Sequence, residues 1–345
     1  MTPAVTDSRR GVRITRFDLA TVVFAIPASL MAIGLATVQG RPIAMIVVGM
    51  VAAIVAVRRQ AMLGAVLIAL TSVVLRLAYI GIGYSTQVDN ARSAAERAWN
   101  GLSPYGFLLP SATTPPEPYV YGPLALVWWH PGVAVEFAAA VGVMAVLIWT
   151  RSWLTLSLYA GLPFAVFLTT TGVNDYSPGF LIASALLLLR THRLLGAGLL
   201  AIAAAIKPYA LAWFLPAVGY AGWMAAVALL AATVVLWSPL ALWGPTSFLR
   251  SIQLQAQLHP DQANALNLPL LRWLAVPFAV IGLIVRRWDH MVLVGSIAFV
   301  IFLFLDRWAS LGYWLAVMPI AGIALEERFD VDPSQRGGWR DSNQV

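Results

Sequence analysis

A polar insert at residues 84–123 interrupts an otherwise apolar chain and begins with a group that could do acid–base chemistry, Asp89. Polar side chains from this point recur at the i, i+3, i+4, i+7 spacing of one helical face: Asp89, Arg92, Ser93, Glu96 and Asn100. We therefore predict a short amphipathic helix, on which the Asp89 carboxylate could take a proton from an acceptor hydroxyl. Thr86 and Asp89 equally fit a capping box, and the sequence leaves both interpretations open.

Aromatic residues and prolines fill the rest of the insert. They stand in Gly101-Leu-Ser-Pro-Tyr105 and in Tyr119-Val-Tyr121-Gly-Pro123. Proline fixes the backbone, and a flat tyrosine ring offers a stacking surface, so Tyr105, Tyr119 and Tyr121 are candidates for a sugar-binding wall. Aromatic residues also mark membrane interfaces in general, and composition alone favours that plainer explanation.

An amide and a carboxylate adjoin at Asn174-Asp175, between two apolar runs. Side chains of this kind could bind sugar hydroxyls, a metal or a second substrate. The same pair also fits a plain turn, with Pro178 in the start of the next helix.

Lys207 is the only lysine in the chain, and it follows the apolar stretch 194–206. An ionisable residue at membrane depth is costly and usually functional, and an ammonium group is a good partner for a phosphate. A lysine at a helix end can also reach outward to the interface. We favour function, because every other basic side chain, histidine aside, is an arginine and because Pro208 breaks the helix there. Arg92 and Arg250 are further candidates for a phosphate contact.

An amide-rich segment at about 244–266 contains His259, which could orient a phosphate or a hydroxyl. A lone histidine in a loop is more often only solvated. The sequence has no zinc-site spacing, no phosphate-cradling glycine loop and no serine–histidine nucleophile pattern. We therefore expect no nucleotide-sugar donor, no bound metal and no cofactor.

The composition predicts what must position these groups. Hydrophobic residues make up 60% of the 345 residues, charged residues only 11%, and the mean hydropathy is +0.79. Such a chain is typical of a polytopic membrane protein. The pI near 10.0 does not indicate nucleic-acid binding, because the arginines stand at the ends of apolar segments, where they set orientation. Without cysteine, disulfides and thiolate metal sites are excluded.

We predict an all-α fold with about 10–12 transmembrane helices, since about 20 apolar residues are needed for each crossing. Residues 1–16 form a cytoplasmic tail, 17–325 the membrane domain and 326–345 a disordered cytoplasmic tail, while 84–123 and 244–266 lie outside the plasma membrane. Prolines and glycines predict interrupted helices at Pro131-Gly132, at Lys207-Pro208 and near 219–222.

Taken in order, these motifs resemble the GT-C membrane glycosyltransferases, in particular the bacterial polyprenol-phosphate-mannose-dependent mannosyltransferases of cell-envelope synthesis. The resemblance rests on four features within about residues 80–215: an early acid, a Gly-x-x-Pro-Tyr turn leading to Tyr-Gly-Pro-Leu, an outer Asn-Asp, and an Ala-x-x-Lys-Pro element. The acid is Asp89, the turn spans residues 101–105 and leads to 121–124, the Asn-Asp pair is 174–175, and the Ala-x-x-Lys-Pro element is 204–208.

The resemblance implies transfer of a hexose, with mannose expected, from a polyprenyl-phosphate donor to an envelope glycolipid or glycan on the outer face, with inversion and Asp89 as the base. It suggests Lys207, Arg92 and Arg250 for the donor phosphate. For the sugar or acceptor it suggests Tyr105, Tyr119, Tyr121, Asn174, Asp175 and His259. The chain is shorter than many members, and Asp89 has no adjacent second carboxylate, so metal assistance is not expected.

Two other functions remain open. A transporter or flippase of lipid-linked sugars would need charges within its spans, for which Arg76 and Glu136 are the candidates besides Lys207, and a two-fold repeat, which does not stand out. A non-catalytic envelope assembly protein would tolerate substitution of Asp89. A pentose donor such as arabinose also remains possible. The sequence does not give the oligomeric state.

Overall fold

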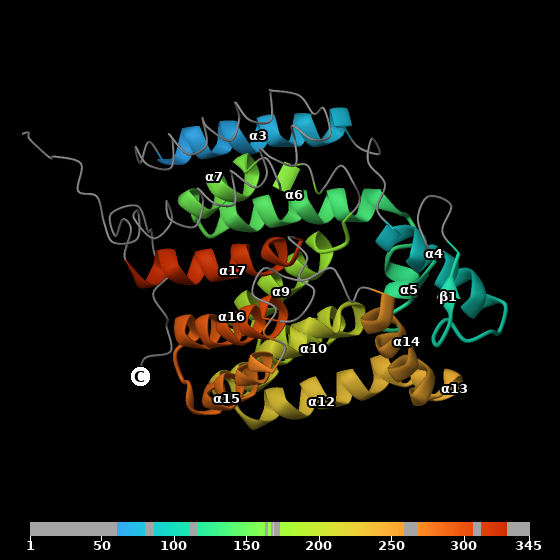
Figure 1. Ribbon diagram of the computed structural model, residues 1–345. Helices are drawn as coiled ribbons and strands as arrows, with labels where there is room; N and C mark the ends of the chain where they lie inside the picture. The colour runs from blue at the N-terminus through green and yellow to red at the C-terminus, as the bar shows by residue number, and fades with distance from the viewer. Residues whose placement is uncertain are drawn as a thin grey trace, which may run out of the picture.

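The structure, a computed structural model, describes residues 61–79, 86–110, 116–162, 165–166, 168, 173–258, 268, 270–305 and 312–329. The predicted tail 1–16, the first two predicted spans, His259 and the residues after 329 lie outside these ranges. The chain is mostly helical, so the predicted all-α class is confirmed. Most helices run side by side in one body, while α4, β1, α5, α13 and α14 gather at one end of it (Figure 1).

The first half of the described chain contains five helices and a short hairpin. Their bounds are α3 Ala61–Tyr79, α4 Thr86–Trp99, β1 Leu108–Leu109, β2 Glu117–Pro118, α5 Ala125–Trp128, α6 Val133–Trp149 and α7 Trp153–Gly161. The hairpin was not predicted; it is antiparallel and pairs Leu108 with Pro118.

The second half is built from shorter helical pieces. Their bounds are α9 Tyr176–Leu188, α10 Arg193–Ile206, η1 Pro208–Trp213, α11 Phe214–Ala221, α12 Trp223–Trp237, α13 Pro239–Trp243, α14 Pro245–Leu258, η2 Leu271–Leu274, α15 Ala275–Ile281, η3 Gly282–Ile284, α16 Trp288–Phe304 and α17 Tyr313–Arg328.

The helix breaks fall where proline and glycine predicted them. Gly132 separates α5 from α6 with φ +74°, and Gly222 separates α11 from α12 with φ +84°. A backbone of this left-handed kind strains side chains with a Cβ. Between α10 and η1 the chain is extended at Lys207 because the following proline disfavours helical geometry. These interruptions leave irregular backbone inside the helical body, where polar groups can be held.

One helical stretch in the described residues, Trp223–Trp243, is long and apolar enough to cross a membrane. Only 11% of its most apolar window is buried, and side chains such as Leu230 and Val235 point outward. Five further apolar helices in the described part of the chain are shorter, from 10 to 17 residues. A polytopic membrane protein with about 10–12 spans therefore remains a prediction.

Helices occupy parts of two segments for which none was predicted. Residues 245–258 form helix α14 rather than loop, since the segment has a proline at its start and no breaker before Leu258. The predicted tail does not begin at Glu326, because α17 runs on to Arg328 and Glu326 is buried. Its carboxylate accepts hydrogen bonds from the Thr155 backbone N–H and hydroxyl, at the start of α7.

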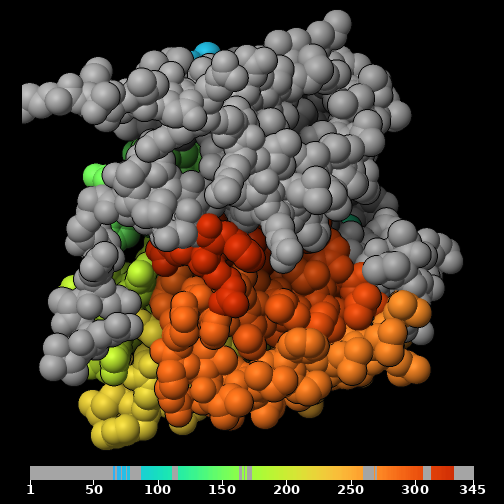
Figure 2. Space-filling view, turned by 90° about the vertical axis from the view of Figure 1, so that its left-hand side faces the viewer, coloured from blue at the N-terminus to red at the C-terminus, as the bar shows by residue number. Residues whose placement is uncertain are grey.

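Charged side chains tie several helices together at the end of the body opposite to α4 and α14. Arg190 pairs with Glu327 at 2.7 Å, and Asp289 contacts both Arg287 and Arg328. Figure 2 looks onto this end, where the surface of α17 (red) adjoins that of α15 and α16 (orange). The polar insert and the arginine-rich helix ends are thus on opposite sides of the helical body.

Candidate functional site

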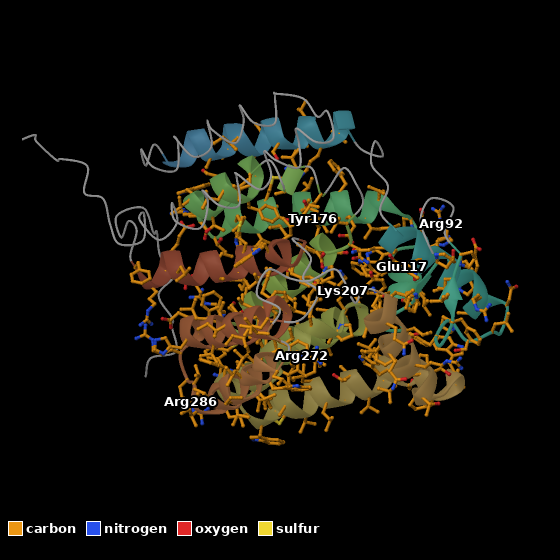
Figure 3. All side chains as sticks on the ribbon, in the orientation of Figure 1. Arg92, Glu117, Tyr176, Lys207, Arg272 and Arg286 are labelled. Carbon is orange, nitrogen blue, oxygen red and sulfur yellow. The ribbon has the colours of Figure 1, made fainter. Side chains whose placement is uncertain are left out.

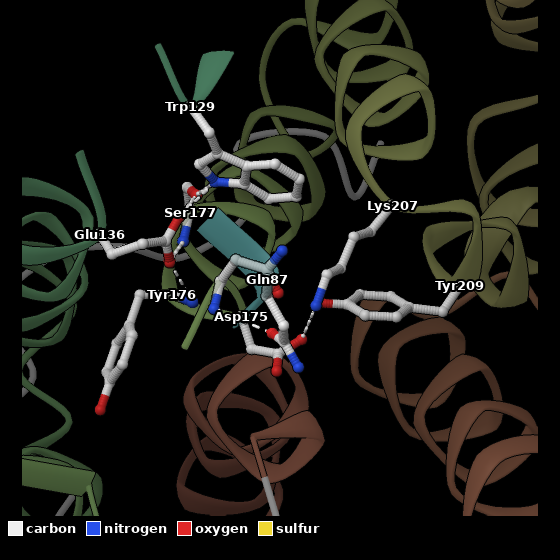
Figure 4. Close-up of polar contacts among 9 residues, drawn as sticks. Gln87, Trp129, Glu136, Asp175, Tyr176, Ser177, Lys207 and Tyr209 are labelled. Carbon is white, nitrogen blue, oxygen red and sulfur yellow. Dashed lines mark hydrogen bonds and ion pairs between the residues drawn. The ribbon is translucent and has the colours of Figure 1, made fainter. Parts of the chain in front are cut away.

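A buried ion pair joins two of the segments that the sequence singled out. The Lys207 ammonium Nζ lies 2.6 Å from Asp175 Oδ1, with side-chain exposures of 5% and 0%. The Tyr209 hydroxyl donates a second hydrogen bond to the same oxygen at 3.0 Å. Figure 4 shows Lys207 and Tyr209 reaching Asp175 from the same side. The sequence did not predict that the candidate phosphate contact would already have an anionic partner.

The second oxygen of Asp175 faces the start of another helix. Asp175 Oδ2 has no hydrogen bond to the residues that the structure describes, and a Cβ placed on Gly312 would lie 2.1 Å from it. Gly312 is the N-cap of α17, a helix of 16 residues. The N-terminus of a helix carries partial positive charge, so the carboxylate is held between the Lys207 ammonium and a favourable helix end.

Lys207 occupies the break between α10 and η1. Its backbone is extended, with φ −128° and ψ +118°, and its N–H still bonds to the Ala203 carbonyl. The ammonium group lies 5.3 Å from the ring centroid of Tyr121, 5.5 Å from that of Tyr209 and 6.0 Å from that of Tyr313. Aromatic faces attract a cation at such distances. The rings therefore keep the ammonium in place from several sides.

The Tyr-Gly-Pro-Leu loop is docked directly on the end of α10. The Gly122 N–H donates to the Ile206 carbonyl at 3.0 Å, and the Leu124 N–H donates to the Ala205 carbonyl at 3.1 Å. A Cβ on Gly122 would lie 2.0 Å from the Ala205 oxygen, so only glycine allows this approach. The loop thereby satisfies carbonyls that the last turn of a helix leaves free, and it brings Tyr121 to Lys207.

Tyr105 and Tyr119 lie behind this loop and are fully buried. Their hydroxyls donate to the Tyr121 and Gly122 carbonyls, at 3.1 and 3.0 Å. Burial raises the pKa of both hydroxyls, so they remain protonated donors. In this conformation they support the loop and offer no surface to a sugar.

Tyr121 is the tyrosine of the insert that reaches the ion pair. Burial raises the pKa of its hydroxyl well above the ordinary value, and the Asn174 side chain beside it lowers that pKa only in part. The hydroxyl therefore stays protonated. Asn174 is itself buried, and its backbone N–H donates to Oε1 of Gln87, on α4, at 3.3 Å. This contact brings the first turn of α4 to the site.

Glu136 is a site residue that the sequence had offered only as a charge for a transporter. Its carboxylate is buried and accepts hydrogen bonds from Trp129 Nε1 at 2.7 Å, from the Tyr176 N–H at 2.9 Å, from the Ser177 N–H at 3.1 Å and from the Ser177 hydroxyl. The sequence pattern that could have indicated Glu136 is an acid in the first turn of an apolar helix, just after the Pro131-Gly132 break.

Asp89 lies in the first turn of α4 and is half-buried. Asp89 is the fourth residue of α4, which begins at Thr86. Within the described ranges its carboxylate has no hydrogen bond and no ion pair.

The other candidate cations do not join the cluster. Arg92 and Arg250 are exposed and form no ion pair in the part of the chain that the structure describes. Figure 3 shows Lys207 in the interior of the molecule and Arg92 beyond α4 at its edge. Among the described residues, no group of three or more histidine, aspartate or glutamate side chains could hold a metal ion.

Comparison with models of protein families, with curated proteins and with solved structures found no match. The functional assignment therefore rests on the residues and the geometry above.

Proposed function

We propose that this protein is a membrane glycosyltransferase that moves a hexose, with mannose expected, from a polyprenyl-phosphate donor to a cell-envelope glycolipid or glycan. One observation carries the proposal. The Tyr-Gly-Pro loop, the Asn-Asp turn and the Lys-Pro break are far apart in the sequence, yet they meet at the buried Asp175–Lys207 pair. The amphipathic helix with Asp89 adjoins them through Gln87.

The free carboxylate of Asp89 is better suited to the role of base than that of Asp175. Asp175 Oδ1 already accepts hydrogen bonds from the Lys207 ammonium and the Tyr209 hydroxyl, and Gly312 packs against Oδ2. Asp89 is partly accessible and has no ion pair among the described residues. In the proposed step the acceptor oxygen bonds to the anomeric carbon, the bond from that carbon to the phosphate oxygen breaks, and the phosphate leaves with the electron pair. Asp89 takes the acceptor proton.

Lys207 supplies the positive charge that the departing lipid phosphate needs. A fixed cation in a water-poor site stabilises developing negative charge without reorganising. Because its only ionic partner in the described residues is Asp175, a phosphate that approaches Lys207 must share the ammonium with that carboxylate. Tyr121 and Tyr313 keep it oriented while it does so.

Two features support an orientation in the plasma membrane. The apolar surface of Trp223–Trp243 is exposed along its length, as a lipid-facing helix requires. Arginines gather at the end of the body opposite to the polar insert, and arginine-rich ends stay in the cytoplasm. The site would then lie on the outer face of the membrane, where polyprenyl-linked sugars and envelope acceptors meet. Both termini would lie in the cytoplasm.

Asp89→Asn tests the proposal in protein reconstituted in lipid, with radiolabelled polyprenyl-phosphate mannose and a membrane glycolipid extract. A general base contributes about 10²–10⁴-fold to rate, so the variant should lose at least about a hundred-fold while it still binds donor. Glu96→Gln is the matched control, because Glu96 is an exposed acid on the same helix with no partner in the described residues. Equal transfer by both variants and the wild type would refute the role of Asp89.

The buried charges of Glu136, Asp175 and Lys207 are also what a transporter of lipid-linked sugars would use. The same reconstituted protein separates the two functions. If it transfers no polyprenyl-linked sugar but moves a fluorescent lipid-linked sugar between leaflets, the transporter takes the place of the transferase.

A further inference from the structure

Glu136 anchors the helix that begins just after the Asn174-Asp175 pair. Its Oε2 accepts the N–H groups of Tyr176 and Ser177, the first two residues of α9. Its Oε1 accepts Trp129 Nε1–H, from the turn that follows α5, and the Ser177 hydroxyl. One buried carboxylate thus fixes the start of α9 against the segment that connects α5 to α6 (Figure 4).

Four donors bond to this carboxylate: two backbone N–H groups, one indole N–H and one hydroxyl, divided evenly between the two oxygens. A glutamine of the same shape would have to turn its NH₂ toward either the two backbone N–H groups or the indole N–H. Either choice sets donor against donor and weakens at least one buried hydrogen bond, although the Ser177 hydroxyl can also accept. The contacts therefore favour a carboxylate over an amide at position 136.

We propose that Glu136 is a positioning residue, which sets the place of Asp175, and through it of Lys207, by holding the first turn of α9. The effect on catalysis rests on the proposed transferase function, but the effect on the ion pair does not. Asp175 immediately precedes Tyr176 in the chain, so a displaced α9 terminus moves its carboxylate away from Lys207. A displacement of about 1 Å far from the chemistry can cost about a hundred-fold in rate.

A second buried glutamate gives a matched control. Glu326 also accepts the N–H of a residue in the first turn of a helix, Thr155 at 2.7 Å, together with that residue's hydroxyl. It belongs to the last turn of α17, away from the polar insert. Glu326→Gln removes the charge of a similar buried carboxylate at a helix start, although its amide oxygen can keep both Thr155 bonds, which go to Oε1 alone. Only Glu136→Gln should disturb Lys207.

The single lysine of the chain makes Lys207 directly observable. Protein grown on lysine labelled with ¹³C at the ε-carbon gives one lysine cross-peak, which needs no assignment and no activity. We expect Glu136→Gln to shift or broaden this cross-peak and to lower kcat at least about ten-fold, with the acceptor KM little changed. Glu136→Asp retains the charge and should restore both measurements in part. Glu326→Gln should leave both as in the wild type.

The cross-peak decides the proposal. If Glu136→Gln and Glu136→Asp both leave it unchanged, or if Glu326→Gln moves it as much, Glu136 acts only on stability and the positioning role is overturned. A wild-type protein that transfers no sugar would contradict the proposed function, while the cross-peak would still test Glu136. If Glu136→Gln does not fold, Glu136→Asp supplies the same comparison.

Discussion

Gly312→Ala should destabilise the protein, although the local backbone favours the opposite result. Gly312 has φ −57° and ψ −29° at the start of α17, which any residue can adopt. Replacing glycine by alanine at such a position ordinarily stabilises by about 0.4–1 kcal/mol, because the unfolded chain loses freedom. The packing around Gly312 reverses this expectation.

The added methyl group would clash with neighbouring atoms. It would lie 2.1 Å from Asp175 Oδ2 and 2.7 Å from Val173 Cγ1, whereas non-bonded atoms prefer separations of about 3.5 Å or more. The carboxylate would have to retreat by about 1 Å, and Lys207 and Tyr209 hold its other oxygen. Overpacking of this kind costs about 1–3 kcal/mol. We expect a net loss in that range, together with a shifted Lys207 cross-peak.

Gly198→Ala is the control. Gly198 lies inside α10, and a Cβ there would meet no atom within 4 Å. This variant should be stabilised by up to about 1 kcal/mol. Denaturant unfolding of both variants in the same detergent measures the difference. Gly312→Ala with wild-type or greater stability would refute the claim that Gly312 packs against a fixed Asp175.

Two further predictions follow from the charges. Asp175→Asn and Lys207→Met should each lower the free energy of unfolding by about 3–5 kcal/mol, since either leaves its partner buried and unpaired. The double variant should lose clearly less than the sum of the two. Additive losses in denaturant unfolding would argue against the pair. Partial burial raises the pKa of Asp289, but the Arg287 hydrogen bond and the charges of His290 and Arg287 outweigh it and lower the pKa. Its stabilisation is therefore complete above the unfolded pKa and is lost as the pH falls through the folded pKa. The stability difference between wild type and Asp289→Asn should shrink below about pH 4, and a difference independent of pH would contradict this.

The sequence predicted the helical segments and their breaks because these depend on neighbours in the chain. Proline at 208 and glycines at 132 and 222 restrict the local backbone whatever surrounds them. The helix α14 was missed because its glutamines resemble a loop in composition, although nothing in the segment ends a helix.

The site was predicted in part for the same reason. Lys207 stood out as an isolated cation in an apolar stretch, but its pairing with Asp175 depends on how α9 and α10 pack, which no local pattern encodes. Arg92 and Arg250 had the right charge, and only the fold shows that both are exposed and form no ion pair among the described residues. Glu136 was undervalued because two of its four donors are backbone N–H groups, which no residue type in the sequence reveals, and because the Ser177 hydroxyl comes from a distant part of the chain.

The docking of Gly122 on the end of α10 also has a consequence for the order in which the protein is made. The loop that contains Gly122 leaves the ribosome long before Ala205 and Ile206, whose carbonyls it binds. Until those residues have been synthesised, the loop lacks the carbonyls that it binds, and neither Tyr121 nor Lys207 has its neighbours. Helix α4 is synthesised early, but the site it adjoins can be completed only after the chain has passed the Lys207-Pro208 break.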